Sequence, residues 1–564
     1  MKKYNLLKVL AITVLVTWVL TLFIPSSSVD YTGNVTKGSI AGVGIWALLS
    51  NLSISISYFN GIAIYLLAIA CFYAIVSKTN AYNNFVSKVS SVFENKKGLL
   101  VSITAIIFAV LACVVSDPMI LLVFIPFIYM VMKNLEIDKK VILSSTIIAS
   151  LIGSMCNIYN STLFSLFKLE LNTLLLVKMI LLVISLFILI FFIAPKKDKK
   201  DNSKKVTKVK GKKTEKTVVK EEKKNASKKT VKSKETKVNK TVYAILTILF
   251  GSFGINKFYA KKFKKGITCL LFCWTLVPTV LSIAEFITVL TEKSDKDGKI
   301  AVSSSRRETV LFTTSLILFV LFIEFTVIPW ESLINNFNAF SNFNTWLSNL
   351  KIGDYAIFSN IIGKPSIVDA TTGSTTGVIG AFGTWALTDV AILLFILTAV
   401  IALFNEVKFD EFVSSCTTGI KKVLPVAITA MLVSIVLVVM VTTGINVTVA
   451  NWILKLTKGF NIATSTLTAM ISSVLTGDFY YFLSTIGPVY TAAISNSDYY
   501  GVVALIIQSI FNLMMFVAPT SVGLIIGLYY LDIPYNKWLK YIWKVFVGIL
   551  LVIIITALVI YFLV

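Results

Sequence analysis

The feature that most constrains this chain is an apolar run that a proline interrupts near its middle. Residues 512–527 read NLMMFVAPTSVGLIIG, which is apolar enough to lie in a lipid bilayer, yet Pro519 stands inside the run. Proline lacks an N–H group and its ring clashes with the carbonyl group four residues earlier, so a continuous helix is not expected here. Backbone groups freed inside hydrocarbon cost several kcal/mol unless protein buries them or they line a wet cavity. The break therefore predicts a folded membrane protein around it.

A second apolar run is interrupted in the same manner. Residues 153–162, GSMCNIYNST, break the apolar stretch 141–167. Broken helices at corresponding positions in two halves of a chain are typical of the binding sites of secondary transporters. The simpler alternative is a pair of kinked helices with a structural role only.

The composition places most of the chain in a membrane. Of 564 residues, 56% are hydrophobic and 14% are charged, and the mean hydropathy is +0.84. Several apolar runs approach the roughly 20 residues that span a bilayer. The six cysteines are scattered and there is no histidine, so the sequence predicts neither a disulfide framework nor a metal site. Without histidine, any proton or cation coupling falls to Asp, Glu or backbone oxygens. We expect no enzyme activity and no cofactor, because no catalytic triad or phosphate-binding loop is evident.

The positive charge is concentrated in one segment. Residues 196–240 hold twenty lysines and six acidic residues, which is +14 of the net +25. Basic segments beside membrane spans favour the cytoplasm and anionic lipid. No aromatic residues alternate with the lysines, so we expect a solvated linker near anionic lipid and no nucleic-acid partner.

The two outer parts of the chain repeat one order of elements. Each has a helix, a surface segment, a helix, an amphipathic segment, a hairpin with an acidic residue at its break, an interrupted helix and a final helix. Residues 26–60 and 405–422 are the expected surface segments, and the hairpins break at 115–118 and 475–478. The first hairpin is either two full spans or a re-entrant pair. Three expected spans separate the two parts, so the second part is inverted relative to the first.

This order predicts an all-α polytopic membrane protein with two inverted repeats, re-entrant hairpins, broken helices and an inserted two-helix hairpin. We expect the N-terminus in the cytoplasm, a retained first helix, and the C-terminus outside a bacterial plasma membrane. The predicted regions are a first repeat (1–195), the lysine-rich linker (196–240), a two-helix module (241–292), a connecting helix with an external loop (293–384), and a second, inverted repeat (385–564).

The two-helix module resembles a known domain. Gly251 and Gly254 precede Lys257-Phe258-Tyr259, and Glu285 follows in the next apolar run. This arrangement resembles the TM2 (two-transmembrane) domain, which implies two helices joined by a short turn. The family usually has Asp at the position of Glu285, and Asn256-Lys257 departs from its usual polar pair.

The outer parts resemble a transporter family. Asn512 with PTSVG at 519–523 and IPYNKWLK at 533–540 is similar to the YfcC-type and C4-dicarboxylate-carrier (DcuC-like) families of the ion transporter superfamily. Lys78-Thr79-Asn80-Ala81, Pro126, Gly153-Ser154 and Asn157 fit the same families. The resemblance implies an elevator-like carrier of dicarboxylates or basic amino acids. The two tips, Ser116-Asp117-Pro118 and Thr476-Gly477-Asp478, depart from the family pattern, so the substrate does not carry over.

Candidate site residues come from the breaks. The interrupted helices supply the expected substrate contacts, which are Asn157, Asn160, Ser161, Asn512, Thr520 and Ser521. The hairpin tips supply the expected ion-coupling residues, which are Ser116, Asp117, Thr476 and Asp478. An acidic residue at membrane depth costs roughly 3 kcal/mol or more and usually has a function; the alternative is that the tip acids are satisfied loop residues at the membrane surface. Glu285 and Glu324 lie near helix ends and are expected at the membrane interface.

The expected function is secondary active transport of a small organic anion or amino acid, of the dicarboxylate or basic amino acid class. Transport would be elevator-like and either coupled to Na⁺ or H⁺ or run as exchange. The expected partners are a small-molecule substrate and the lipid bilayer, with a homodimer as an open alternative. The competing hypothesis is a non-transporting membrane scaffold or sensor built on a degenerate carrier fold.

Overall fold

The computed structural model describes residues 3–563, apart from 31–33, 41, 159, 171–173, 195–235, 303–304, 335, 363, 366–376, 379, 458 and 495. The expected lysine-rich linker, 196–240, lies almost entirely outside the described residues. Helices dominate the described part, and its strands form four two-stranded antiparallel pairs. Within it, seven helices are long and apolar enough to cross a membrane. The predicted fold class, an all-α polytopic membrane protein, is confirmed.

The chain divides into two compact units. The larger unit comprises Met1–Ala194 and Leu316–Val564, and the smaller unit comprises Pro195–Ser315. The larger unit contains both copies of the repeated element order.

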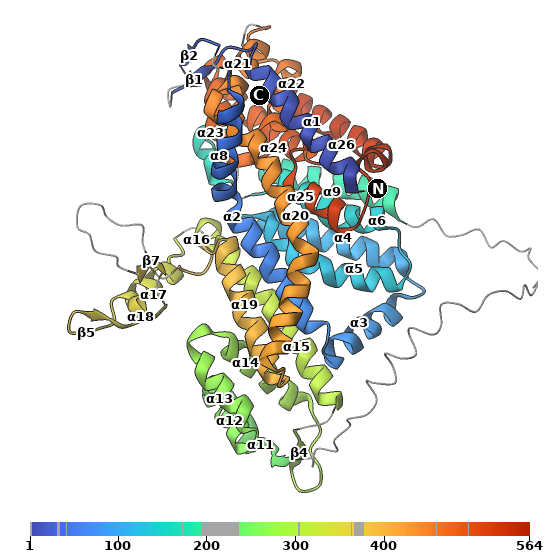
Figure 1. Ribbon diagram of the computed structural model, residues 1–564, viewed down its shortest axis with the longest axis vertical. Helices are drawn as coiled ribbons and strands as arrows, with labels where there is room; N and C mark the ends of the chain where they lie inside the picture. Colours follow the sequence, from blue (N-terminus) through green and yellow to red (C-terminus); the bar gives the residue numbers. More distant parts are fainter. Residues whose placement is uncertain are drawn as a thin grey trace, which may run out of the picture. The chain divides into compact units, whose positions relative to one another are not determined.

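The first copy begins with a helix and a strand pair and continues through two broken helical segments (Figure 1). Its elements are α1 (Lys3–Thr21), β1 (Ser27–Val29), β2 (Val35–Lys37), α2 (Ile45–Val76), α3 (Asn80–Phe93), α4 (Lys97–Val114), the 3-10 helix η1 (Pro118–Phe124), α5 (Ile125–Asn134), α6 (Lys139–Leu143), the π-helix η2 (Ser144–Ile148), α7 (Ala149–Met155), α8 (Ser161–Leu166) and α9 (Leu175–Ile193).

The second copy repeats the order with more regular helices. Its elements are α19 (Leu387–Phe404), α20 (Phe409–Thr443), α21 (Ile445–Leu454), α22 (Ile462–Thr476), α23 (Phe479–Ala493), η5 (Ser497–Tyr499), α24 (Tyr500–Met514), α25 (Val522–Tyr530) and α26 (Tyr535–Leu563). The chain breaks between α4 and η1, α7 and α8, α22 and α23, and α24 and α25. All four breaks fall where the sequence predicts them.

The two expected surface segments are not separate elements. Residues 45–60 belong to α2, which runs unbroken for 32 residues, and residues 409–422 belong to α20, which runs for 35 residues through Pro425. Two polar side chains in this part of α2, those of Asn51 and Ser55, are buried in the protein. Ser55 is fully buried and its hydroxyl donates to the carbonyl of Asn51 at 2.9 Å. A polar side chain that forms its hydrogen bond to the backbone of its own helix can be buried without ending the helix.

Equivalent helices of the two copies pack against each other in opposite directions. The start of α20 lies beside the end of α2, because a Cβ atom at Gly419 would lie 2.6 Å from the Ala70 carbonyl oxygen and 3.0 Å from the Ala74 side chain. The end of α20 lies beside the start of the repeat, because a Cβ atom at Gly444 would lie 2.0 Å from the Ser27 carbonyl oxygen. The pair α9 and α26 is also antiparallel, since Phe192 contacts Tyr541 with ring centroids 5.0 Å apart.

Other contacts between a helix of one copy and a helix of the same or the other copy are matched by a contact between the two equivalent helices. Helix α19 packs on α2 while α1 packs on α20, and α4 packs on α7 while α22 packs on α24. Helices α7 and α24, which are equivalent, pack on each other. Reciprocal pairing of antiparallel equivalents is what two inverted repeats produce.

A connecting segment separates the two copies in the sequence. It comprises α15 (Ser305–Val327), α16 (Trp330–Leu333), α17 (Ala339–Ser348), β5 (Lys351–Ile352), β6 (Tyr355–Ala356), α18 (Ile357–Ile362), β7 (Lys364–Pro365) and β8 (Gly377–Val378). Phe322, Phe325, Phe340, Phe382 and Trp385 form an aromatic cluster in which neighbouring ring centroids are 5.2–6.3 Å apart.

The smaller unit has more helices than the expected pair. Its elements are β3 (Lys237–Asn239), α11 (Lys240–Phe250), η3 (Gly251–Phe253), α12 (Ile255–Tyr259), α13 (Phe263–Phe272), η4 (Cys273–Thr275), α14 (Val277–Thr291) and β4 (Lys299–Ala301). Helices α11 and α14 pack together, but two further helices connect them in place of a short turn. The reversal after α11 needs Gly254, whose φ is +76° and whose Cβ would lie 2.5 Å from the Gly266 carbonyl oxygen.

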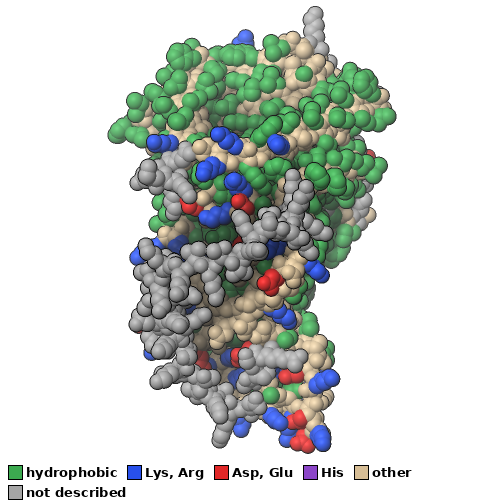
Figure 2. Space-filling model, turned by 90° about the vertical axis from the view of Figure 1, so that its right-hand side faces the viewer, with side chains coloured by type: hydrophobic (Ala, Val, Ile, Leu, Met, Phe, Trp, Pro, Cys, Tyr) green, Lys and Arg blue, Asp and Glu red, His purple; other side chains and the backbone are tan. Residues whose placement is uncertain are grey.

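The surface of the larger unit is apolar where lipid would contact it. Phe187 and Phe191 of α9 are 70% and 80% exposed. Figure 2 shows hydrophobic side chains covering much of the upper part of the view, the level at which Figure 1 draws α21, α22 and α26. Exposed apolar surface of this extent fits a bilayer and not water.

Candidate functional site

The four breaks meet at one cavity in the larger unit. The cavity has a volume of about 530 Å³, and helix α2 closes it with Phe59 and Ile62. Eight of the ten predicted site residues line it, namely Ser116, Asp117, Asn157, Asn160, Ser161, Asp478, Asn512 and Ser521. Residues separated by up to four hundred positions in the sequence thus surround one space.

Each hairpin tip is shaped by its aspartate. Asp117 is the N-cap of η1 and accepts a hydrogen bond from the Met119 N–H at 2.9 Å. Asp478 is the N-cap of α23 and accepts one from the Tyr481 N–H at 3.0 Å. A side-chain oxygen at the N-cap satisfies a backbone donor that the helix itself leaves unpaired. Both aspartates are half-buried and line the cavity, so each has a structural role and also faces the site.

The interrupted helices restart at the cavity with polar caps. Asn160 accepts a hydrogen bond from the Leu163 N–H at 3.0 Å at the start of α8, and Ser521 accepts one from the Leu524 N–H at 3.4 Å at the start of α25. Asn157 donates to the carbonyls of Ala112 and Val115 at 3.1 and 2.8 Å, which ties the α7–α8 break to the end of α4.

The other two predicted residues lie behind the lining. The Thr520 hydroxyl donates to the Val474 carbonyl at 2.7 Å, and the Thr476 hydroxyl donates to the Ser472 carbonyl at 2.8 Å. Gly477, with φ +65°, leaves room for the Thr520 carbonyl, which would lie 2.6 Å from a Cβ atom there. These contacts join the second tip to the start of α25, so Thr520 positions the tip and does not face the cavity.

A buried lysine and a buried glutamine were missed from the sequence. Lys178 of α9 is 1% exposed, and its ammonium group donates to the Asn157 carbonyl at 3.0 Å and to Gln508 Oε1 at 2.7 Å. Gln508 of α24 donates in turn to the carbonyls of Ser154 and Asn157 at 3.1 and 2.9 Å. These contacts satisfy carbonyl groups that the end of α7 leaves free. The signal was present, because Lys178 is the sole charged residue within 174–194 and an ionisable residue in a span usually has a role.

A second cavity lies further along α2. It has a volume of about 490 Å³ and is lined by Leu66, Ile69, Ala70, Tyr73 and Ala74 of α2, by residues of α20, by Leu122 and Pro126 of the first hairpin, and by Ile526 and Tyr530 of α25. Its polar end contains Lys78 and Lys422, together with the serines Ser77, Ser414 and Ser415.

Helix α2 and the 3-10 helix η1 contribute residues to both cavities. Pro118 and Met119 of η1 line the first cavity, whereas Leu122 lines the second. Between them Tyr65 of α2, which is fully buried, donates its hydroxyl to the Ile120 carbonyl at 2.5 Å. Along α2 and η1, Tyr65 and Ile120 therefore stand between residues that line the first cavity and residues that line the second.

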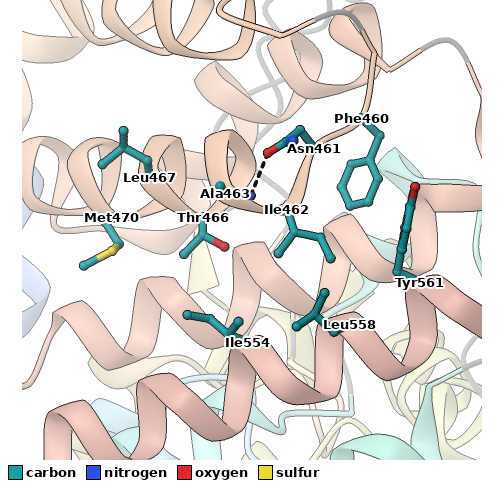
Figure 3. Close-up of a pocket in the computed structure, with 10 residues that line it drawn as sticks. All are labelled: Phe460, Asn461, Ile462, Ala463, Thr466, Leu467, Met470, Ile554, Leu558 and Tyr561. Carbon is teal, nitrogen blue, oxygen red and sulfur yellow. Dashed lines mark hydrogen bonds between the residues drawn. The ribbon is translucent and has the colours of Figure 1, made fainter.

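A third hollow is unlike the first two. Side chains of α22 and α26 face one another around a space of about 580 Å³ (Figure 3). Its lining is mostly apolar, and the amide oxygen of Asn461 is used to cap α22 by accepting from the Ala463 N–H at 2.9 Å. It contains none of the ten predicted site residues.

The smaller unit buries a charged cluster around Glu285. This side chain is 2% exposed, so the protein itself surrounds it. Its oxygens accept hydrogen bonds from the Tyr243 hydroxyl at 2.6 Å and the Asn256 amide at 2.9 Å, and it pairs with Lys257 and with Arg307. Asn256 and Lys257, the two residues that depart from the TM2 pattern, thus both contact the glutamate that replaces the usual aspartate. A buried carboxylate needs such partners to offset its desolvation.

Comparison with known proteins identifies part of the chain. Residues 236–287 match the family model of the TM2 domain. Over 49 residues, or 9% of this chain, the sequence is 46% identical to the uncharacterized membrane protein YozV of Bacillus subtilis (strain 168), and the match spans 62% of that protein's length. No solved structure matches the chain. The resemblance of the outer parts to YfcC-type and DcuC-like carriers stays a prediction. The chain is a polytopic membrane protein that carries a TM2 domain at residues 236–287.

Proposed function

We propose that the protein is a secondary active transporter for a small amino-acid or organic-anion substrate, acting in the bacterial plasma membrane. The observation that carries this proposal is the pair of cavities along α2, separated by the Tyr65–Ile120 contact. A transporter needs a site that opens to either side of a barrier but never to both at once. In this proposal the Tyr65–Ile120 contact is the barrier, and each of the two cavities opens to one side of it.

The moving part in this proposal consists of the hairpin tips and interrupted helices. Both cavities have α2 on one side and the first hairpin with α25 on the other. Helices α2 and α20 pack too closely to accept a Cβ atom at Gly419, and in this proposal they are the part that stays in place. Displacement of the hairpins along this support closes one cavity and opens the other, as in an elevator mechanism.

The charges of the first cavity favour a substrate with an amino group. Among the described residues, the lining contains the carboxylates of Asp117 and Asp478 and no lysine or arginine. The helix N-terminus at Ser521 offers backbone N–H groups to one carboxylate of a substrate. A dicarboxylate would bring two negative charges beside two aspartates, whereas a basic amino acid pairs its ammonium groups with them. We therefore rank basic amino acids above dicarboxylates, with Na⁺ or H⁺ as the coupling ion.

Uptake into proteoliposomes tests this proposal. The purified full-length chain is reconstituted and offered labelled basic amino acids, neutral amino acids and dicarboxylates under sodium, proton or zero gradients. We expect uptake of a basic amino acid. The Tyr65→Phe variant should change the rate of this uptake, because it removes the barrier hydrogen bond and keeps the ring. Tyr355→Phe is the matched control, since its ring is 54% exposed and lines neither of the two cavities. Absence of uptake and of exchange across the panel would contradict the proposal and favour the scaffold or sensor hypothesis.

A further inference from the structure

Helix α15 carries a carboxylate with no hydrogen-bond partner. Glu324 was expected at the membrane interface, but its side chain is 5% exposed and neither Oε1 nor Oε2 has a hydrogen-bond partner among the described residues. The residue lies three positions before the end of a helix that is apolar enough to span a membrane.

Such a group is stable only without its charge. An isolated carboxylate in a low-dielectric interior loses its hydration and gains nothing in exchange, so the group takes up a proton instead. In the described part of the chain no lysine or arginine pairs with Glu324. The titratable side chain that interacts electrostatically with Glu324 is Tyr65 of α2, which also interacts with Asp117 of the first tip, and neither Tyr65 nor Asp117 is a cation.

Glu324 is connected to the first hairpin tip. One turn further along α15, the Val327 carbonyl accepts a hydrogen bond from the Ser116 hydroxyl at 3.3 Å. Tyr65, which forms the barrier between the cavities, lies within electrostatic range of both Glu324 and Asp117. A displacement of the tip would therefore break the contact with α15 and open the surroundings of Glu324 to the cavity.

We propose that Glu324 is the proton-binding site of the transport cycle. While the first tip lies against α15, the Glu324 side chain is a neutral carboxylic acid. When the tip moves away, this side chain releases its proton to water in the cavity and becomes a carboxylate. This inference rests on the proposed transport function for its role in coupling, but the bound proton itself can be observed without any substrate.

Infrared spectroscopy of the full-length protein in lipid gives the first test. The wild-type protein should show the carbonyl-stretch band of a protonated carboxylic acid at neutral pH, and Glu324→Gln should lose it. Glu331→Gln is the matched control, because hydrogen bonds from the Ser341 hydroxyl and N–H lower the pKa of Glu331 and keep it ionised. Glu324→Asp, which keeps an acid in place, should retain the band. Persistence of the whole band in Glu324→Gln would overturn the proposal.

Accessibility of the cavity gives the second test. A single cysteine replaces Thr162, which is exposed and lines the first cavity, in a variant without the native cysteines. We expect its labelling rate by a maleimide to change severalfold between mildly acidic and mildly alkaline buffer, and the change to vanish with Glu324→Gln. An unchanged pH dependence in that variant would overturn the link between the proton and the tip.

Transport assays separate the two proposals. If a substrate is found, Glu324→Gln should keep exchange, which needs no net proton movement, and lose accumulation driven by a pH gradient. Normal gradient-driven accumulation in that variant would refute the coupling role while transport itself stands. If the parent transports nothing, the proposed function fails, and the infrared and labelling results still decide whether Glu324 binds a tip-linked proton.

Discussion

Lys178 donates a hydrogen bond of 2.7 Å to Gln508, and this contact joins α9 of the first repeat to α24 of the second. The lysine ammonium group occupies the position at the end of α7 where free carbonyl groups would otherwise need another cation or water. Its charge also lies over the face of the Phe164 ring, 4.7 Å from the centroid. The two repeats therefore depend on one buried cation at the back of the cavity.

Replacing this cation should destabilise the larger unit. Lys178→Met removes hydrogen bonds from a charged donor, each worth about 1.5–3 kcal/mol, and takes away the donor that the Gln508 oxygen accepts from. We expect a clear fall in the thermal unfolding midpoint in detergent, whereas Lys544→Met on the exposed side of α26 should change it little. The double variant with Gln508→Leu should lose less than the sum of the single losses. Additive losses would show that the two side chains do not act together.

Neutralising the tip aspartates should abolish accumulation of substrate without unfolding the protein. Asn is as good an N-cap as Asp, so Asp117→Asn and Asp478→Asn keep the tip geometry and remove only the charge. In a cavity of low dielectric the lost attraction to a cation is large. Uptake under an imposed sodium or proton gradient measures the effect. Parental uptake in both variants would exclude the aspartates from substrate and ion binding.

Thr520 should affect the stability of the second tip and not the affinity for substrate. Thr520→Val keeps the shape of the side chain but removes its hydrogen bond to the Val474 carbonyl, which is worth about 1 kcal/mol. We expect lower thermal stability and a similar apparent substrate affinity, whereas Ser521→Ala, at the cavity, should weaken affinity. Thr556→Val, which removes a helix-internal hydroxyl contact in α26, is the control. A large loss of affinity with Thr520→Val alone would place Thr520 in the site.

The orientation of the termini remains a prediction from charge and span parity. Single cysteines at Ser227, Ser348 and Val564 should be labelled from the inside, the outside and the outside of the cell, respectively. Positions 227 and 564 lie outside the described residues, so labelling of intact cells and inverted vesicles is the direct measurement. Labelling of Val564 only from the cytoplasm would contradict the expected topology.

The TM2 domain should be removable as a module. Deleting residues 196–308 removes Glu285 together with its partners Lys257 and Arg307, so no buried charge is left unpaired. We expect the second repeat to keep its orientation and the cavity residues their labelling. By contrast, Lys257→Met in the intact chain isolates part of the cluster and should destabilise the smaller unit by about 3–5 kcal/mol. Protease digestion of this unit measures that loss, and failure of the deletion variant to insert correctly would show that the TM2 domain is integral.

The sequence alone determined where the helices break. Proline, glycine, asparagine and aspartate act locally, either by removing a backbone donor or by supplying a side-chain cap, so the breaks at 115–118, 153–162, 475–478 and around Pro519 could be found without any tertiary contact. The inverted order of elements followed from the same local signals. The predicted site residues, chosen from these breaks, therefore mostly meet at one cavity.

Tertiary structure decided which polar groups face the protein and which face the cavity. Residues 26–60 were expected to be a surface segment, but Asn51 and Ser55 within that range are buried, and α2 runs through them and packs on α19 and α20. Thr520 lies beside the cavity residue Ser521 in the sequence, yet its hydroxyl turns to the Val474 carbonyl of another helix. Lys178 and Glu324 are both buried, but Lys178 donates to the Asn157 carbonyl and to Gln508, whereas the Glu324 carboxylate has no hydrogen-bond partner among the described residues. The burial of a side chain and its hydrogen-bond partners depend on residues far apart in the chain. Local sequence patterns do not show which of these residues come together.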